Sequence, residues 1–422
     1  IVCFQVVQVH RRTDNMKAVD NDLSMNILVI GTGMYVCGRG ADGHGTILPA
    51  IYEWARCGRL GDIYIAGTHA EGIAEVSRKV EELNSLFGFD IVPRYFPESD
   101  TYNPDAYKVA MCEITKPACV IVVVPDHLHR DIAGDTVANN IHTLVVKPLA
   151  PTVKDVVELI ELQERCGVYC AVEFHKRLDR SNLKLRDTIV SGKIGDPLYF
   201  IVEYSQRKSI PEEKFKSWVD DTNIFQYLGI HYVDIIYFVT GAIPRRVMAI
   251  GQKNYLSSRG IDNYDSIQVV VEWEMPSGAL FSSVILTNWI DPESSSAMSN
   301  QRIKVIGTKG RYEADQKRRG ICITSDEEGV EEPNPDFCSM YGSQKGDISF
   351  QGYGIDSITR FLKDVTKIES GELKVEELDS RRPTFKESIV PTVIIEAVNR
   401  SIVENGRWIN TMFEDGRFSG YE

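Results

Sequence analysis

The sequence predicts an α/β protein of two domains, with a doubly wound parallel sheet first and an α/β domain with a largely antiparallel, open-faced sheet second. Three observations predict this fold. Short apolar strands alternate with helical stretches in the first third of the chain, a glycine-rich turn follows the first strand, and strands of alternating polarity dominate later. Repeated strand–helix units require a parallel sheet that is covered on both faces. The 422 residues suffice for about two domains.

Bulk composition excludes several kinds of partner. The net charge of −13 argues against nucleic acid or an anionic membrane, because binding a polyanion requires a positive surface. No apolar run approaches the ~20 residues that span a bilayer. The nine cysteines form no C-x-x-C pair and their number is odd, so neither a disulfide framework nor a zinc site is indicated. We expect no bound metal and a cytoplasmic location.

The first domain is expected to span residues 25–173. Residues 1–24 precede Met25 and the first strand, and we expect this leading segment to be disordered or artefactual. Strands are predicted at residues 27–30, 62–66, 119–124, 142–146 and 168–172. Helices are predicted at residues 46–57, 71–87, 107–114, 131–139 and 153–166. Ligands of such a sheet bind outside the carboxyl ends of its strands, so the residues that follow each strand are the candidates for a site.

A glycine-rich turn follows the first strand, at Gly31, Gly33 and Met34. Glycine there lets the backbone approach a diphosphate, whose charge suits the amide-rich start of a helix. Val36 replaces the third glycine of G-x-G-x-x-G, so we expect an enlarged phosphate loop over residues 34–45 and a helix that starts near residue 46. A mobile surface loop is the alternative.

The second domain is expected to span residues 174–422, to bind substrate and to mediate oligomerisation. Helices are predicted at residues 183–191, 226–239, 356–368 and 388–404. Strands of alternating polarity are predicted at residues 246–252, 266–275, 279–288, 301–306, 310–314 and 320–324, with a loop at 325–335. Such strands form a mostly antiparallel sheet with one open face. A second subunit is a good cover for that face, so a homodimer or homotetramer is expected.

Lys147 is the first candidate for chemistry, since it ends the strand at residues 142–146 and is followed by Pro148. A lysine at this edge of the sheet can hydrogen-bond a substrate hydroxyl and help to move its proton as a hydride leaves. A solvated lysine at a strand end is the alternative.

Tyr227 and His231 are the second candidate, because their i,i+4 spacing places them on one face of the predicted helix at residues 226–239. A histidine gives or takes a proton near neutral pH, and a tyrosine hydroxyl donates or relays one. The alternative is a core histidine satisfied by Asp234 or by a backbone carbonyl.

Two polar loops complete the candidate site. Residues 124–129 (VPDHLH) follow a buried strand, where the nicotinamide half of a cofactor would rest. Residues 173–177 (EFHKR) follow the last strand of the sheet, at the junction of the two domains. Ordinary polar loops are the alternative, although two such loops at one sheet edge favour a site.

These features together resemble the glucose–fructose oxidoreductase / inositol dehydrogenase / MocA family of nicotinamide-dependent oxidoreductases, over essentially all of residues 25–410. Seven segments in the same order carry the resemblance: ILVIGTG, VVVPDHLH, VVKPLA, VEFHKRLD, IVSGKIGDPLYF, LGIHYVD and IKVIGTKGRYE. Membership implies a Rossmann domain followed by an α/β domain whose open sheet mediates dimers or tetramers.

The resemblance also implies roles for individual residues. Lys147 matches the lysine of the family's E-K-P motif and His231 the histidine of its D-x-x-x-H pattern. Tyr227 does not match that pattern, and we expect it to orient the substrate or relay the proton. The expected cofactor contacts are Gly31, Gly33, Met34, Thr68, His69, Val124, Pro125, His129, Lys147 and Glu173. The implied substrate contacts are Lys147, His175, Arg177, Tyr227 and His231.

Two departures from the family pattern remove carboxylates from the catalytic region. The glutamate that precedes the lysine is replaced by Val146, so its electrostatic support is missing. The aspartate four residues before the histidine is replaced by Tyr227, which removes a carboxylate from the proton relay.

A third departure concerns the cofactor. Residues 67–69 (Gly-Thr-His) stand where NAD-preferring members have an acidic residue, and without that carboxylate NADP becomes more acceptable. His69, with Arg78 or Lys79, could compensate a 2′-phosphate, and Arg39 could reach a phosphate or be solvated. NAD or NADP is therefore expected, with a slight tilt to NADP.

The expected activity is hydride transfer between nicotinamide and a carbinol carbon of a sugar, cyclic polyol or nucleotide-sugar. No metal is needed, because a lysine supplies the positive charge that polarises a forming carbonyl. One alternative is a non-catalytic regulator that binds NAD(P). Another is a redox-neutral enzyme, an epimerase or glycosidase-like hydrolase, that keeps its NAD bound.

Overall fold

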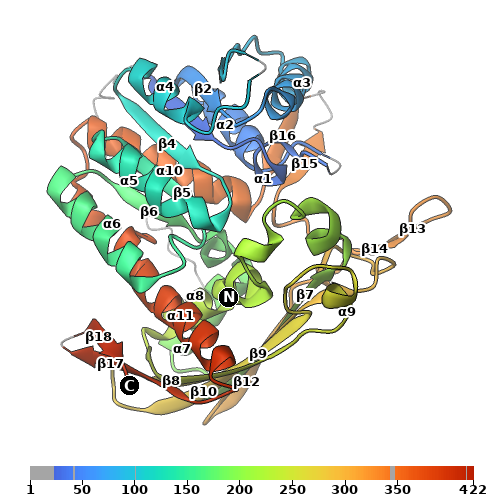
Figure 1. Cartoon of the computed structure of the whole chain (residues 1–422), viewed down its shortest axis with the longest axis vertical. Helices are drawn as coiled ribbons and strands as arrows, with labels where there is room; N and C mark the ends of the chain where they lie inside the picture. Colours follow the sequence, from blue (N-terminus) through green and yellow to red (C-terminus); the bar gives the residue numbers. More distant parts are fainter. Residues whose placement is uncertain (1–22, 41–42, 100, 343–346, 415) are drawn as a thin grey trace, which may run out of the picture.

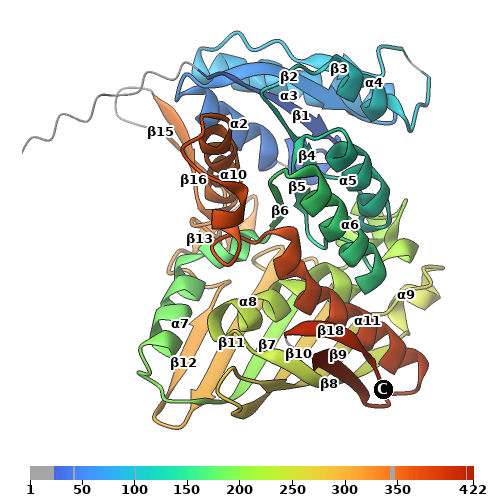
Figure 2. The ribbon, with the colours of Figure 1, turned by 90° about the vertical axis from the view of Figure 1, so that its left-hand side faces the viewer.

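The structure is a computed structural model that describes residues 23–40, 43–99, 101–342, 347–414 and 416–422. The segment expected to be disordered or artefactual, residues 1–24, lies outside the described residues except at positions 23 and 24. Two sheets lie at opposite ends of the molecule with helices between them (Figure 2). Among the described helices, none is both long and apolar enough to cross a bilayer.

The first sheet is parallel, with six strands in the order β3-β2-β1-β4-β5-β6. The order reverses at β1, and this is the switch point at which doubly wound Rossmann sheets bind their ligands. The strands are β1 (Met25–Ile30), β2 (Leu60–Ala66), β3 (Arg94–Phe96), β4 (Ala118–Val122), β5 (His142–Val146) and β6 (Cys170–Glu173). Five of them were predicted; β3 was missed, because three residues are too few to give a pattern.

Helices cover both faces of this sheet (Figure 2). Their bounds are α1 (Met34–Cys37), α2 (Ile47–Ala55), α3 (Ala70–Phe87), α4 (Ala106–Glu113), α5 (His129–Ala138) and α6 (Val153–Cys166). Helices α2 and α3 share one apolar core with the sheet, and α4, α5 and α6 share the core on the opposite face. Each helix buries one apolar stripe, which is the amphipathic pattern that predicted them.

Helix α10 (Tyr353–Glu369) completes the first domain although it comes from the last part of the chain. Its residues Ile358, Phe361 and Leu362 are buried in the same core as α2 and α3. Figure 1 shows this helix beside β5 and β6, in the upper half of the molecule. The expected division at residue 174 assigns this helix to the second domain, so the chain returns to the first domain near its end.

The second sheet has eight strands in the order β12-β11-β7-β10-β9-β8-β17-β18. Only β7 and β10 pair in parallel; the other pairs are antiparallel. The strands are β7 (Pro197–Arg207), β8 (Ile243–Gln252), β9 (Ser266–Glu274), β10 (Leu280–Asp291), β11 (Ser299–Gly307), β12 (Gly310–Asp315), β17 (Ile409–Glu414) and β18 (Arg417–Tyr421). The mostly antiparallel sheet was predicted; β7, β17 and β18 were missed.

One face of the second sheet is covered and the other is open. The covering helices are α7 (Arg180–Val190), α8 (Ile230–Thr240) and α11 (Ile389–Val403). Along β9 every second residue is buried and the others are half-exposed, which is the expected pattern for an open face. Apolar side chains on this open face include Tyr199 and Ile201 of β7.

The remaining short elements lie in loops and small hairpins. The stretch predicted as a loop at residues 325–335 instead contributes β14 to a hairpin with β13. The short elements are α9 (Tyr255–Ser258), β13 (Ile323–Ser325), β14 (Gly329–Glu331), β15 (Ser339–Gly342), β16 (Ile348–Gln351), η1 (Asp126–Leu128), η2 (His175–Leu178), η3 (Ile210–Lys214), η4 (Val219–Asp221), η5 (Phe225–Gly229), η6 (Val375–Leu378) and η7 (Phe385–Ser388).

Candidate functional site

A cavity of about 2000 Å³ runs along the carboxyl ends of the first sheet and continues to the second sheet. It is the place where a doubly wound sheet binds its ligand. The predicted residues that line it are Gly31, Gly33, Met34, Thr68, His69, Val124, Pro125, Lys147, Glu173, His175, Tyr227 and His231. Two predicted residues, His129 and Arg177, are not part of its lining.

The two glycines of the turn after β1, Gly31 and Gly33, differ in the space around them. Gly31 has a φ of +128°, and a Cβ there would lie 2.0 Å from the carbonyl oxygen of Val123, so packing between β1 and β4 excludes any side chain. A Cβ on Gly33 would meet nothing within 4 Å, so this position opens into free space at the start of α1. The predicted loop at residues 34–45 therefore contains a helical turn, and α2 begins at Ile47, close to the expected residue 46.

The described residues fit a dinucleotide. The first amide groups of a helix have no partner within it, and those of α1 border the free space at Gly33. Thr68 and His69 follow β2 at the same end of the cavity. Gly67 packs against Thr32, where a Cβ would lie 2.8 Å from the threonine methyl group. Residues 67–69 thus hold no carboxylate toward the cavity.

Of the basic residues expected near a 2′-phosphate, Arg78 and Lys79 pair with glutamates on their own helix. Arg78 pairs with Glu75 at 2.6 Å and also with Glu82, and Lys79 lies 3.4 Å from Glu82. Neither residue lines the cavity, so the expectation that Arg78 or Lys79 assists His69 was wrong. Arg39 does line it, with its guanidinium 3.0 Å from the exposed Glu71.

Lys147 follows β5 and is partly buried, so the alternative of a solvated lysine was wrong. Its Nζ donates a 2.6 Å hydrogen bond to the backbone carbonyl of Tyr227 and lies 3.7 Å from the centroid of that ring. Burial lowers the pKa of Lys147 to about 8, and the nearby carboxylates of Asp126 and Glu173 oppose the shift. The amine therefore changes charge within the working range of many enzymes.

Tyr227 and His231 line the cavity, although the local helix differs from the one predicted. Tyr227 lies in the π-helical turn η5, and His231 lies in α8, which follows it directly. The ring of Tyr227 packs among Phe215, Trp218 and Trp289. Burial raises the pKa of Tyr227, so its hydroxyl stays protonated.

His231 is buried and its Nδ1 has no hydrogen-bond partner among the described residues. Burial, together with the positive charges of Lys147 and Lys176 and the neighbouring His175, lowers its pKa well below the usual value. The ring is therefore neutral near pH 7. The alternative in which Asp234 satisfies it was wrong, because Asp234 pairs with Arg177.

Arg177 was expected at the substrate and instead fixes α8. Its guanidinium lies 2.6 Å from Asp234 and 3.1 Å from Glu387, and all three side chains lie away from the cavity lining. Both carboxylates raise the pKa of Arg177 against the effect of burial. A buried arginine with two carboxylates is a structural ion pair, and the substrate-binding prediction for Arg177 was wrong.

His129 was expected to contact the cofactor and instead joins two loops beneath it. It is fully buried, with Nδ1 2.6 Å from the carbonyl oxygen of Pro148 and Nε2 2.8 Å from that of Val124. It therefore holds the loops after β4 and β5 at a fixed separation. Val124, which lies at one of these contacts, does line the cavity.

Lys176 lies in the predicted polar loop at residues 173–177 but was not singled out as a site residue, and it lines the cavity beside the second sheet. It is buried, hydrogen-bonds the side-chain oxygen of Gln301 and lies 5.1 Å from the centroid of the Tyr204 ring. Burial lowers the pKa of Lys176 to about 8, opposed by the charge of Asp179. The run of three basic residues at 175–177 indicated that one of them could face a cavity. The local sequence does not show which of the three does so.

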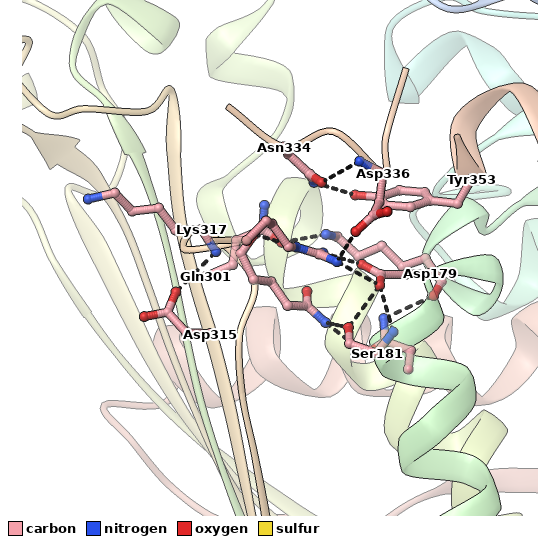
Figure 3. Close-up of polar contacts among 12 residues, drawn as sticks. Asp179, Ser181, Gln301, Asp315, Lys317, Asn334, Asp336 and Tyr353 are labelled. Atoms are coloured by element: carbon pink, nitrogen blue, oxygen red, sulfur yellow. Dashed lines mark hydrogen bonds and ion pairs between the residues drawn. The ribbon is translucent and has the colours of Figure 1, made fainter. Parts of the chain in front are cut away.

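An ion-pair network supports this end of the cavity (Figure 3). Arg319 lies 2.5 Å from Asp179 and 3.0 Å from Asp336, which ties the segment after β12 to the start of α7. The hydroxyl of Tyr353 accepts a 3.2 Å hydrogen bond from Asn334. These contacts place Tyr353 in the cavity wall, a role that no sequence signal indicated, because it depends on the return of α10.

Glu173 and His175 both line the cavity and contact each other. The carboxylate of Glu173 is 2% exposed, and its Oε2 lies 2.7 Å from Nδ1 of His175. Glu173 pairs in register with Val146 across β6 and β5, beside Lys147. Among the described residues, no cluster of side chains has the composition and spacing of a metal site.

Two family models match the chain. Residues 73–174 match the oxidoreductase family with an NAD-binding Rossmann fold, and residues 182–313 match the GFO/IDH/MocA C-terminal domain. The fold and the cavity thus define a two-domain protein of the NAD-binding oxidoreductase class. The chain belongs to the Gfo/Idh/MocA family.

Individual relatives cover only part of the sequence. Myo-inositol 2-dehydrogenase of Thermotoga maritima is 27% identical over 212 residues, which are 50% of this chain and 60% of that protein. The 2,7-anhydro-N-acetylneuraminate hydratase of Escherichia coli is 24% identical over 200 residues, which are 47% of this chain and 52% of that protein. The chain spans about half to three-fifths of the length of these curated relatives.

A solved structure extends the likeness to the whole fold. Scyllo-inositol dehydrogenase from Lactobacillus casei, with bound cofactor NAD(H) and scyllo-inositol, superposes with a TM-score of 0.64. The match covers 92% of this chain and 99% of that one, at 15% identity. At this identity the likeness concerns the fold.

Proposed function

We propose that this protein is an NAD(P)-dependent oxidoreductase that transfers hydride between nicotinamide and a carbinol carbon of a sugar, cyclic polyol or nucleotide-sugar. The observation that supports this most is that Lys147 and His231, far apart in the sequence, line one cavity with the glycine turn. The inositol dehydrogenases among the relatives favour a polyol.

In this proposal Gly33, Met34, Thr68 and Pro125 hold the dinucleotide, which supplies the hydride acceptor when bound. Lys147 donates a hydrogen bond to the substrate oxygen and stabilises its negative charge as the carbonyl forms. His231, which is neutral, holds or receives the hydroxyl proton. Tyr227 orients Lys147 through its ring and its backbone carbonyl.

NADP is proposed as an accepted cofactor beside NAD. Residues 67–69 carry no carboxylate to repel a 2′-phosphate, and Arg39, whose guanidinium lies beside Gly72 at the start of α3, is a cation of the cavity lining. The open face of the second sheet supports the further proposal of a homodimer or homotetramer. A cytoplasmic location stays a prediction from the scattered cysteines.

A redox-neutral reaction is the second candidate. One relative bears the name of a hydratase rather than a dehydrogenase, and the chain lacks two carboxylates of the family pattern, at Val146 and Tyr227. Such an enzyme would release its product without net change of the cofactor. A regulator that binds NAD(P) without turnover is the third reading.

The test is turnover of inositols, hexoses, uronic acids and nucleotide-sugars with NAD and with NADP, followed by the absorbance of the reduced nicotinamide. Oxidation that Lys147→Met abolishes, with cofactor affinity unchanged, supports the proposal. Retained turnover in that variant contradicts the mechanism. Cofactor binding without oxidation of any compound favours the regulator, and product formation without net reduction favours the redox-neutral enzyme.

A further inference from the structure

His175 carries a carboxylate partner, whereas His231 does not. Nδ1 of His175 lies 2.7 Å from Oε2 of Glu173, and the two rings, of His175 and His231, have centroids 5.0 Å apart. Nε2 of His175 has no hydrogen-bond partner among the described residues, and the side chain lines the cavity. Because Nδ1–H donates to the carboxylate, Nε2 is the nitrogen left to accept a proton.

The other two basic groups are less suited to take a proton. Nζ of Lys147 already donates to the Tyr227 carbonyl and sits against the Tyr227 ring, so this amine is placed as a hydrogen-bond donor. His231 is surrounded by Lys147, Lys176 and His175, so a further positive charge on its ring is opposed by its neighbours. Its buried Nδ1 has no acceptor to stabilise a proton.

Glu173 and His175 lie in an enclosed part of the cavity wall. Its Oε1 is buried without a hydrogen-bond partner, and the hydroxyl of Tyr35, from α1, lies 3.3 Å from the Nδ1 to which Oε2 is bonded. Burial and the adjacent Glu173 raise the pKa of Tyr35 well above its usual value, so this hydroxyl stays protonated. Because an Nδ1 that donates to Glu173 has no free lone pair, Tyr35 does not donate to it in this tautomer. Phe337 and Tyr353 enclose the other sides of the His175 ring, at 5.4 and 5.6 Å between centroids.

We propose that His175, oriented by Glu173, is the catalytic residue that accepts the hydroxyl proton of the substrate, while His231 only orients the hydroxyl oxygen. This inference rests on the proposed oxidoreductase function. Glu173 acts through His175 and is a positioning residue. A carboxylate that fixes the tautomer of an imidazole and stabilises its cation is the arrangement that makes histidine an effective base.

Oxidation of a carbinol breaks one O–H bond and one C–H bond. The O–H bond breaks, its proton binds Nε2 of His175, and the electron pair left on oxygen forms the carbonyl. The C–H bond breaks, and its electron pair leaves as hydride to the nicotinamide. The carbinol carbon loses two electrons, the cofactor gains them, and the new imidazolium is neutralised by Glu173.

Magnetic resonance of the protein labelled with ¹⁵N-histidine tests the proton acceptor without substrate or cofactor. From the contact with Glu173 we expect His175 to carry its proton on Nδ1 and none on Nε2, and His175→Gln identifies its signals. Glu173→Gln should remove this signature. Glu369→Gln is the matched control, because Glu369 lies 2.9 Å from Nε2 of the buried His142 outside the cavity, and it should alter the His142 signals alone. A wild-type His175 that carries its proton on Nε2, or on both nitrogens, overturns the proposal.

Kinetics with the best substrate of the panel give the second readout. We expect Glu173→Gln and His175→Gln to lower kcat by about 10²-fold or more, with KM and NAD(P) affinity within threefold of wild type. Substrate deuterated at the carbinol carbon should give a larger isotope effect in both variants, which a purely structural role would not produce. Glu369→Gln should leave kcat within threefold.

The two proposals fail in different ways. If Glu173→Gln keeps kcat within threefold of wild type while Lys147→Met is inactive, the role of His175 is overturned and the oxidoreductase stands. If the wild type binds NAD(P) and oxidises nothing in the panel, the oxidoreductase falls and this proton path with it. Should Glu173→Gln prevent folding, the resonance signature of the wild type, identified with His175→Gln, still decides.

Discussion

The ammonium of Lys147 lies 3.7 Å from the ring centroid of Tyr227 and donates a 2.6 Å hydrogen bond to the backbone carbonyl of the same residue. Tyr227 stands where the family pattern has a carboxylate. The ring face and the backbone carbonyl of Tyr227 therefore stabilise the Lys147 ammonium in place of an ion pair. Neither compensates burial fully, because the pKa of Lys147 falls to about 8. The charge of this lysine is therefore sensitive to pH.

The first prediction concerns alkaline pH. The ammonium is the form that stabilises the substrate oxygen, so turnover should fall as pH rises through about 8, where Lys147 loses its proton. An ordinary lysine would keep its charge until about 10.4. Lys147→Arg stays charged and should remove this alkaline decline at a lower rate, and Lys147→Met should lower kcat about 10³-fold. A profile of kcat that stays flat above pH 8 contradicts the role.

The second prediction separates the two glycines of the turn. Gly31→Ala places a Cβ 2.0 Å from the Val123 oxygen at a φ of +128° and should destabilise the protein by roughly 3 kcal/mol. Gly33→Ala meets no atom and should leave the melting temperature unchanged. Its methyl group occupies the space for the diphosphate, so NAD(P) affinity should fall about tenfold or more. Calorimetric binding and melting curves measure both effects, and unchanged affinity in Gly33→Ala would contradict the placement of the cofactor.

Much of the fold could be predicted because periodicity is local. The fully buried β4 has an uninterrupted apolar run, and the alternating β9 shows its two faces in its own residues. The position of α10 could not be predicted, because its amphipathic pattern shows that it packs but not against which sheet. Strand β7 was missed because exposed Leu198 and Tyr199 interrupt its alternation.

The candidate site was predicted where a residue's place at a strand end decides its direction, as for Lys147 and Gly31. The prediction failed where the direction of a side chain depends on a partner that is distant in the sequence. Arg177 and Lys176 are adjacent in sequence, and only the positions of Asp234 and Gln301, on other elements, decide which of them enters the cavity.

The third prediction concerns cofactor choice. Arg39 lines the cofactor end of the cavity, whereas Arg78 and Lys79 are engaged by Glu82. Arg39→Ala should weaken NADP binding about tenfold and NAD binding less than threefold, because only NADP offers a phosphate to the guanidinium. Arg78→Ala is the control and should change neither affinity. Equal losses for both cofactors would show that Arg39 does not read the 2′-position.

The fourth prediction contrasts two neighbouring cations. Arg177→Met leaves the buried Asp234 without its partner and should cost about 3–5 kcal/mol of stability, measured by chemical denaturation. Lys176→Met should change stability far less and raise KM about tenfold, because it removes a charged hydrogen-bond donor from the cavity. If Arg177→Met folds stably and raises KM alone, our structural assignment of Arg177 is wrong.

The fifth prediction concerns the open face of the second sheet. Ile201 of β7 is 37% exposed there and pairs in register with Val284 of β10, so the apolar surface continues across neighbouring strands. If a second copy covers this surface, Ile201→Glu buries an unpaired charge in the interface and should convert the oligomer to monomers, because burying a charge without a partner is costly. Val190→Glu is the matched control, since Val190 is 74% exposed on α7, away from this sheet face. Light scattering of the three proteins measures the change: an oligomer that survives Ile201→Glu would place the interface elsewhere, and a monomeric wild type would remove it altogether.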